Sequence, residues 1–310
     1  MTPGTDAGGI DRSSVWMLGG AISFASMGAL VHALGDRCDW LVVALIRALM
    51  MFVTASILAK ASGSKLAVWR PRTLWLRSLA GSFSLVCNFY ALARLPVADA
   101  VTLMNVHPLW IVLISAIAIR RPPSIGEVVG VFSGLIGVVL IEQPHVGVDR
   151  LAALVALLSS VSTAIAMLGL HKLRHLDPRA VVAHFAGVAS LISAIWLILR
   201  RETLSPGLME PITMLLLLGV GISGTLGQVF LTKAYAAGAP AKVAVVGLTQ
   251  VVFAMGFDVG LWGRPLTPTA LAGFALVMAP TTWLSLRAAK KLSTTVRPEP
   301  LPIPKSAEVP

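Results

Sequence analysis

The stretch Gly81–Ala100 reads GSFSLVCNFYALARLPVADA, and the stretch Gly224–Val243 reads GTLGQVFLTKAYAAGAPAKV. The two align at one constant offset without a gap, with Gly81 on Gly224 and Ala91 on Ala234. The same register places Arg121-Pro122 on Arg264-Pro265. Small, turn-forming and apolar residues therefore recur together. We interpret this pattern as an internal duplication, and we call residues that align in this register repeat mates.

The composition around the duplicated stretch is that of a membrane protein. Of 310 residues, 56% are hydrophobic and 13% are charged, whereas soluble domains average about 25% charged residues. Apolar runs of roughly 17–23 residues recur, which is the length of a membrane-spanning helix. We expect helices near residues 15–35, 40–59, 74–93, 98–119, 125–141, 151–171, 179–199, 212–233, 240–262 and 269–287. The fold class predicted is an all-α membrane protein of about ten transmembrane helices.

The duplication divides these spans into two halves of five. We expect a first repeat over 15–141, a second over 151–287, and a disordered tail over 288–310, which is basic and then Pro-rich. Because five is odd, the second half enters the bilayer from the opposite side. Inverted repeats are typical of secondary transporters, which bind substrate near the midplane between the halves. The sequence therefore favours a carrier over a structural membrane protein.

The basic residues predict the topology. With the amino terminus inside, about 18 Lys and Arg flank the spans on that side and about 6 on the other. The larger set includes Arg70, Arg77, Arg120 and Arg121, and Arg77 is counted there although it falls at the start of the helix expected over 74–93. We expect both termini in the cytoplasm and a bacterial-type inner membrane. The net charge of +11 is then a topology signal, so no nucleic-acid partner is expected.

Several segments resemble the EamA type of the drug/metabolite transporter superfamily. Ala44-Leu45-Ile46-Arg47-Ala48-Leu49 is similar to its second-helix Arg motif. Phe89–Ala100 and Lys233–Lys242 resemble its third-to-fourth-helix junction in the two halves, and Pro280 suits its last helix. The resemblance implies transport of amino acids, vitamins, nucleotide-like metabolites or drugs. The chain departs from the family at 119–122 and 262–265, where an acidic residue common in EamA proteins is missing.

The leading candidates for a substrate site are His107 and Gln250. They are repeat mates near the middle of the fourth and ninth expected helices. Pro108 frees a backbone carbonyl one turn earlier, and Asn105 and Trp110 flank the pair. The alternative is that His107 only bonds between helices.

Other polar residues at membrane depth need a reason, because ionisable groups there cost about 2.5–3.5 kcal/mol. Arg47 could attract a carboxylate or phosphate of the substrate, or reach outward to the interface. Asp258 and His107 are candidates for proton or ion coupling, although Asp258 could instead pair with Arg264. Further candidates for lining the path, or for bonding between helices, are Asn88, Tyr90, Gln228 and Tyr235.

The expected function is secondary transport of a small polar metabolite, such as an amino acid or related compound, with export favoured over import. A membrane-embedded lipid enzyme and a channel are the alternatives from other classes. The chain has no P-loop and no zinc motif, so it is not expected to be an enzyme or to hold a cofactor or metal. Expected partners are the small-molecule substrate and membrane lipid. Gly126, Gly130 and Gly134 could pack a second copy of the chain in a homodimer, or pack helices within the chain.

Overall fold

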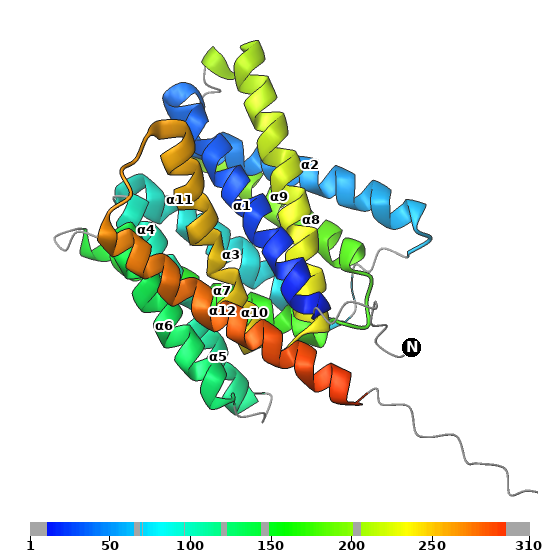
Figure 1. Cartoon of the computed structure of the whole chain (residues 1–310). Coiled ribbons are helices and arrows are strands. Elements are labelled where there is room, and N and C mark those ends of the chain that lie inside the picture. The colour runs from blue at the N-terminus through cyan, green and yellow to red at the C-terminus, as the bar shows by residue number, and fades with distance from the viewer. Residues whose placement is uncertain are drawn as a thin grey trace, which may run out of the picture.

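The computed structural model describes residues 11–64, 69, 71–95, 97–118, 123–143, 149–200 and 206–295. Every regular element in these ranges is a helix, which confirms the all-α prediction (Figure 1). The first half comprises α1 (Arg12–Leu34), η1 (Gly35–Arg37), α2 (Trp40–Ala61), α3 (Arg72–Arg94), α4 (Val97–Met104), α5 (His107–Ala118) and α6 (Ile125–Glu142). The second comprises α7 (Arg150–Lys172), α8 (Pro178–Arg200), η2 (Pro206–Met209), α9 (Pro211–Ala237), α10 (Pro240–Gly247), α11 (Thr249–Trp262) and α12 (Pro268–Thr295).

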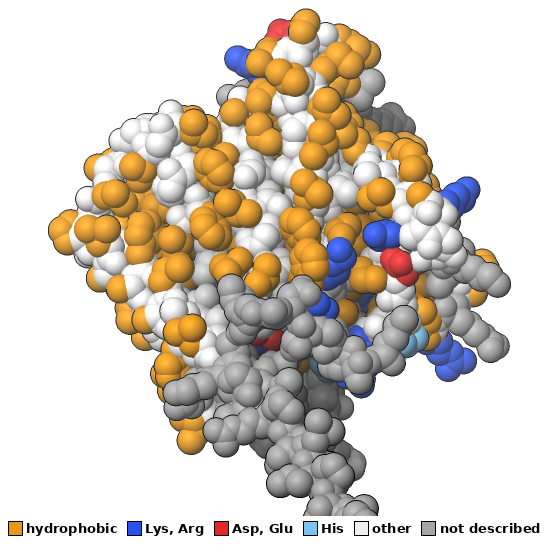
Figure 2. Space-filling model, turned by 45° about the vertical axis from the view of Figure 1, so that its right-hand side comes forward, with side chains coloured by type: hydrophobic (Ala, Val, Ile, Leu, Met, Phe, Trp, Pro, Cys, Tyr) orange, Lys and Arg blue, Asp and Glu red, His pale blue; other side chains and the backbone are white. Residues whose placement is uncertain are grey.

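Nine helices or helix pairs of the described chain are long and apolar enough to cross a membrane. α3, with 23 residues, is also long enough, but it is less apolar because it contains Arg77 and three serines. Large apolar side chains lie on the outside of the bundle, such as Ile57, Leu191 and Leu261, each more than 60% exposed. Figure 2 shows how such side chains cover one face. This surface is suited to lipid rather than to water.

The start of α1 and the end of α12 lie at the same end of the bundle (Figure 1). We call this end the N-side and the other the opposite side. α12 continues to Thr295, so the first residues of the expected tail are helical. Residues 296–310 lie outside the described part, as do Lys65, Arg70, Pro96, Arg120, Arg121 and Arg201.

The fourth and ninth spans are each built from two helices, not from one continuous helix as expected. α4 ends at Met104 and α5 begins at His107, because Pro108 has no N–H for the Met104 carbonyl. His107 Nδ1 lies 3.2 Å from that oxygen instead. α10 ends at Gly247 and α11 begins at Thr249, whose hydroxyl donates to Val246 O at 2.7 Å. The two breaks fall at equivalent points of the repeat.

The most extensive helix contacts all join the two halves. They are α1 with α9, α3 with α7, α2 with α8, and α6 with α12. In the repeat, α1 corresponds to α7, α2 to α8, α3 to α9 and α6 to α12. Exchange of the two halves therefore turns the α1–α9 contact into the α7–α3 contact, and it maps the α2–α8 and α6–α12 contacts onto themselves. The packing therefore has the two-fold pattern of an inverted repeat.

The glycines of α6 serve contacts inside this bundle. A Cβ at Gly126 would meet Trp283, one at Gly130 would meet Leu284 and Val245, and one at Gly134 would meet Leu248. Further along, Gly137 and Gly273 lie backbone to backbone between α6 and α12. The face expected to suit a homodimer is thus occupied within the chain, and the dimer stays a prediction.

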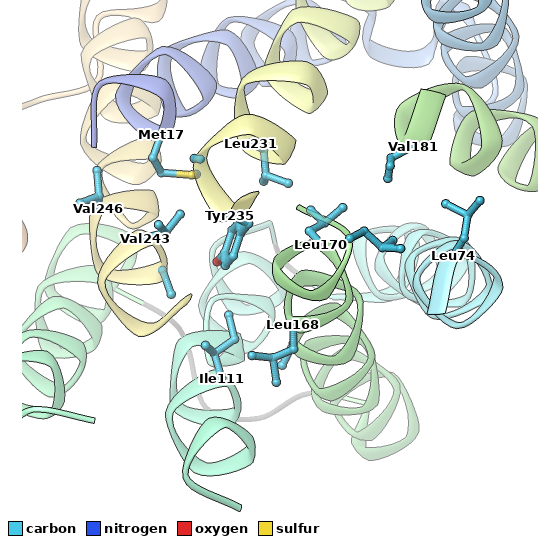
Figure 3. Packing of buried hydrophobic residues seen from close by; sticks show 14 residues of the cluster. Met17, Leu74, Ile111, Leu168, Leu170, Val181, Leu231, Tyr235, Val243 and Val246 are labelled. Atoms are coloured by element: carbon cyan, nitrogen blue, oxygen red, sulfur yellow. The ribbon is translucent and has the colours of Figure 1, made fainter. Parts of the chain in front are cut away.

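The largest buried apolar cluster lies on the N-side and joins both halves (Figure 3). We call it the N-side core. Leu74, Ile111, Leu168, Leu170 and Val181 contribute from α3, α5, α7 and α8, and Met17, Leu231, Tyr235, Val243 and Val246 from α1, α9 and α10. Two smaller clusters accompany it in the N-side half, around Met51 and Val131, and three lie toward the opposite side, around Leu34, Ala91 and Val251. The cluster with the most residues is therefore on the N-side.

The helix contacts show the same asymmetry. α5 packs against α10 on the N-side, whereas the repeat-related halves α4 and α11 have no contact of similar extent. α7 likewise packs against α9, while their counterparts α1 and α3 do not pack to that degree. A Cβ at Gly28, in the half of α1 toward the opposite side, would meet nothing within 4 Å. The bundle is closed on the N-side, and the matching contacts of the opposite side are not made.

Polar contacts reinforce the N-side closure. Lys242 on α10 forms an ion pair with Asp11, which caps α1, and both side chains are mostly buried. Burial acts to raise the pKa of Asp11, but the hydrogen bonds from Lys242 and Ser13 outweigh it and leave that pKa lowered. The carboxylate therefore stays charged until the pH falls through this lowered pKa. His171 Nδ1 lies 3.1 Å from Tyr235 O and links α7 to α9.

Replacement of Lys242 by Met should loosen the N-side. A charge-assisted hydrogen bond contributes about 1.5–3 kcal/mol, and about 1.4 kcal/mol is tenfold in an equilibrium. Amide hydrogen exchange in the first turns of α1 and α10 should therefore rise about tenfold. Lys60→Met, at the exposed end of α2, is the control for the lost charge. Equal exchange in the wild type and Lys242→Met would contradict the assignment.

The α6–α12 contact predicts a second effect. A Cβ at Gly273 would lie 2.6 Å from the Gly137 carbonyl oxygen, where only backbone could move aside. Gly273→Ala should lower the free energy of unfolding by about 1–3 kcal/mol. Gly28→Ala, in open space, should leave it unchanged or raise it slightly. Thermal unfolding in detergent measures both, and equal midpoints for the two variants would refute the close contact.

Candidate functional site

The two breaks place His107 and Gln250 at matching positions. His107 is the first residue of α5 and Gln250 the second of α11, and both side chains are partly buried. His107 Nδ1 lies against the Met104 carbonyl, so Nε2 is the nitrogen left for another partner. Within the described chain, the Gln250 amide has no hydrogen bond and none joins it to His107. The pair therefore has free donors and acceptors at the middle of the bundle.

Asn105 and Trp110 are bound to their surroundings. Asn105 Nδ2 donates to Val101 O at 2.9 Å across the break. Trp110 Nε1 donates to Ser160 Oγ on α7 at 2.9 Å, and its ring packs against the N-side core. Asn105 thus caps the end of α4, and Trp110 anchors α5 to α7. Their direct contact with substrate stays a prediction.

Arg47 lies beside the middle of α9. Its Nε would be 2.9 Å from a Cβ at Gly224, so glycine leaves the room that the guanidinium occupies. Nε has no hydrogen-bond partner within the described chain, and the side chain is partly buried. Guanidinium groups bind carboxylates and phosphates through paired hydrogen bonds. Arg47 can therefore offer a donor to an anionic ligand.

The α3 candidates lie against neighbouring side chains. Asn88 Oδ1 accepts a hydrogen bond from Ser159 Oγ on α7. Ser84 Oγ lies 2.5 Å from Thr163 Oγ1 in the same α3–α7 seam. The Tyr90 ring lies below the Arg94 guanidinium, 5.3 Å from its carbon. The contacts of Asn88 and Ser84 join α3 to α7, which is the alternative expected for Asn88, whereas the Tyr90–Arg94 contact lies within α3.

The α9 candidates are the most deeply buried. Gln228 is 5% exposed, and its Nε2 has no partner in the described chain. Tyr235 is 1% exposed and belongs to the N-side core. Gln228 thus has a donor available, whereas Tyr235 contributes to closure of the N-side.

Asp258 is paired on the opposite side. Arg264 Nη1 donates to Asp258 Oδ2 at 3.1 Å, and Arg264 Nη2 donates to Ile141 O at 3.2 Å. The ion pair is about one third exposed. A role in coupling would require Asp258 to exchange Arg264 for a proton or another cation, and this role stays a prediction.

Sequence reasoning missed Arg77. It was counted only as a topology marker on the inner side, but it lies within α3 and is 1% exposed. His171, Asp11 and Lys242 were also missed as contacts of the N-side. The available signal was position, because Arg77, six residues past Pro71, already falls inside the helix expected over 74–93. In the described chain, no group of three or more His, Cys, Asp or Glu could hold a metal.

Known proteins match both the sequence and the fold. Residues 12–143 and 150–286 each match the EamA-like transporter family. The chain is 29% identical over 263 residues to the pseudopaline exporter CntI of Pseudomonas aeruginosa, covering 83% of this chain and 90% of that protein. It is 28% identical over 211 residues to an uncharacterized transporter of Helicobacter pylori, covering 67% and 71%.

A solved crystal structure shares the fold, with a TM-score of 0.77 at 18% identity over 88% of this chain and 97% of that one. The family match extends over nearly all spans, and the broken fourth and ninth spans lie in its two copies. The chain is a multi-pass membrane protein and belongs to the EamA-like transporter family.

Proposed function

We propose that the chain is a secondary carrier that exports a small polar metabolite, such as an amino acid or a related compound. The relative named as an exporter supports the direction. The excess of Lys and Arg on the N-side supports a cytoplasmic location for both termini in a bacterial-type inner membrane. The absence of a P-loop favours energy from a gradient over ATP hydrolysis in this chain.

The proposal rests on one observation: the fold is a two-fold repeat, yet its helices are closely packed on the N-side and not at the matching place on the opposite side. Contacts between α5 and α10 have no equal between α4 and α11, although the helices are repeat-related. In an inverted repeat, exchange of these two contact sets yields a second state of similar energy. Such an exchange opens the N-side and closes the opposite side, which is alternating access. The present state then faces away from the cytoplasm.

The substrate site of this carrier lies at the two helix breaks. His107 Nε2 and the Gln250 amide offer neutral donors and acceptors at equivalent depths. Arg47 adds a positive charge with a free Nε beside Gly224. A zwitterionic or acidic amino-acid-like compound fits this combination better than a hydrophobic cation. Gln228 Nε2 is a further donor.

Flux out of loaded proteoliposomes tests the carrier directly. With amino acids and related compounds inside and a proton or sodium gradient imposed, a carrier gives gradient-dependent efflux that saturates with solute concentration. Collapse of the gradient with an ionophore and protein-free liposomes are the controls. No flux of any compound would contradict transport, and flux that rises linearly without saturation would favour a channel.

Ligand binding tests the site. A ligand at about 100 times its Kd raises the free energy of unfolding by about 2.7 kcal/mol. A compound that stabilises the wild type in detergent should lose this effect in His107→Ala and in Gln250→Ala. His32→Ala is the matched control, because His32 lies edge-on to Trp262 near the opposite end, 4.5 Å between ring centroids. A full shift retained in both site variants would place the site elsewhere.

A further inference from the structure

Arg77 is a buried cation with unused hydrogen-bond donors. It lies in the second turn of α3 on the N-side and is 1% exposed. Its Nε and Nη1 have no hydrogen-bond partner, and within the described residues no carboxylate pairs with it. A buried charge normally has a partner, because removal from water is costly. Arg77 therefore lacks, in this state, the partner that its chemistry requires.

The surrounding helices form a fitted socket for this side chain. Its guanidinium carbon lies 3.9 Å from the centroid of the Phe185 ring on α8. A Cβ at Gly81 would be 2.6 Å from Nη1, and one at Gly169 on α7 would be 3.0 Å from Arg77 Cβ. The ring attracts the cation, yet it does not satisfy the in-plane N–H groups. Two glycines and one aromatic ring thus hold a guanidinium whose Nε and Nη1 have no hydrogen-bond partner among the described residues.

The socket is adjacent to the N-side core along α3, α7 and α8. Leu74 stands one turn before Arg77 on α3, Leu170 follows Gly169 on α7, and Val181 stands one turn before Phe185 on α8. Figure 3 shows Leu74, Leu170 and Val181 on one flank of the cluster, with Met17, Val243 and Val246 on the other. When the N-side opens, these flanks separate. Arg77 is then the buried cation adjacent to the new opening.

The repeat supplies an independent argument. Gly81 and Gly224 are repeat mates, and each leaves room for a guanidinium: Arg77 at Gly81 and Arg47 at Gly224. With the N-side closed, Arg47 is partly exposed and Arg77 is covered. Arg47 and Arg77 are not repeat mates themselves, but exchange of the two states exchanges the environments of Gly81 and Gly224, the glycines beside them. We therefore expect Arg77 to become accessible as Arg47 is covered.

We propose that Arg77 binds an anionic group of the substrate when the carrier is open on the N-side, and that the substrate carries a carboxylate or phosphate. This inference rests on the proposed carrier function and names the substrate class. Both anions present oxygens that match the planar fork of Arg. Arg77 takes up the anion from the N-side, and Arg47 holds it in the opposite state.

Side-specific thiol labelling tests the accessibility. In a Cys38→Ser, Cys87→Ser background, Arg77→Cys and Arg47→Cys are exposed to the impermeant anionic reagent sulfonatoethyl methanethiosulfonate in everted and right-side-out vesicles. Arg77→Cys should react about tenfold faster from the N-side, and Arg47→Cys about tenfold faster from the opposite side. Reaction of Arg77→Cys from the opposite side, or from neither side, would overturn the proposal.

If the substitution Arg77→Cys disturbs folding, Arg77→Lys, which keeps the positive charge, tests the same proposal. The thermal midpoints of the wild type and Arg77→Lys are compared in citrate, inorganic phosphate and choline chloride of equal ionic strength. Citrate or phosphate should stabilise the wild type, and the shift should fall at least about twofold in Arg77→Lys, because Lys lacks the planar fork. The more effective anion separates carboxylate from phosphate recognition.

Arg174→Lys, at an exposed position on the N-side, should keep the full shift. Equal anion shifts in all three proteins, or no shift in the wild type, would refute anion binding at Arg77. Arg77→Lys should also raise the KM for flux from the N-side about tenfold with little change in kcat. Normal N-side KM in this variant would overturn the inference and leave the carrier intact, whereas absent flux in the wild type would contradict the carrier itself.

Discussion

The structure depends on packing between two halves that cannot each form a core alone. The four largest helix contacts join a helix of one half to a helix of the other, and the N-side core draws residues from both. Within a bilayer, helices associate through close packing and hydrogen bonds rather than through exclusion of water. The halves are therefore interleaved, and movement of one changes the surroundings of the other. Because the halves are interleaved, the bundle can adopt two states that differ in whether the N-side contacts or their repeat-related counterparts on the opposite side are formed.

Hydropathy and the duplication were enough to predict the framework. The expected helices match the observed spans closely, because backbone groups in lipid must bond within a helix and long apolar runs have few other solutions. Pro108 gave a reason for the break before α5. The break at Leu248 has no proline and follows from packing and from the Thr249 hydroxyl, so the sequence pattern could not reveal it.

Side-chain roles were harder to predict. Asn88 was expected either to line the path or to bond between helices, and it accepts a bond from Ser159 across the α3–α7 seam. Arg77 looked like a topology marker because it stands near the end of an apolar run, and only the packing of Gly81, Gly169 and Phe185 reveals its burial. Partners of this kind come from helices distant in sequence, which hydropathy and spacing do not identify. His107 and Gln250 could be paired beforehand because the duplication itself relates them.

Transport by this fold requires the N-side and the opposite side of the bundle to close alternately. Spin labels at Arg174 and Ala237 report on the N-side, and labels at Val31 and at Arg94, the repeat mate of Ala237, report on the opposite side. Double electron–electron resonance should give two distance populations for each pair, and a condition that lengthens the first distance should shorten the second. Distances that stay fixed, or that lengthen together, would contradict alternating access by this fold.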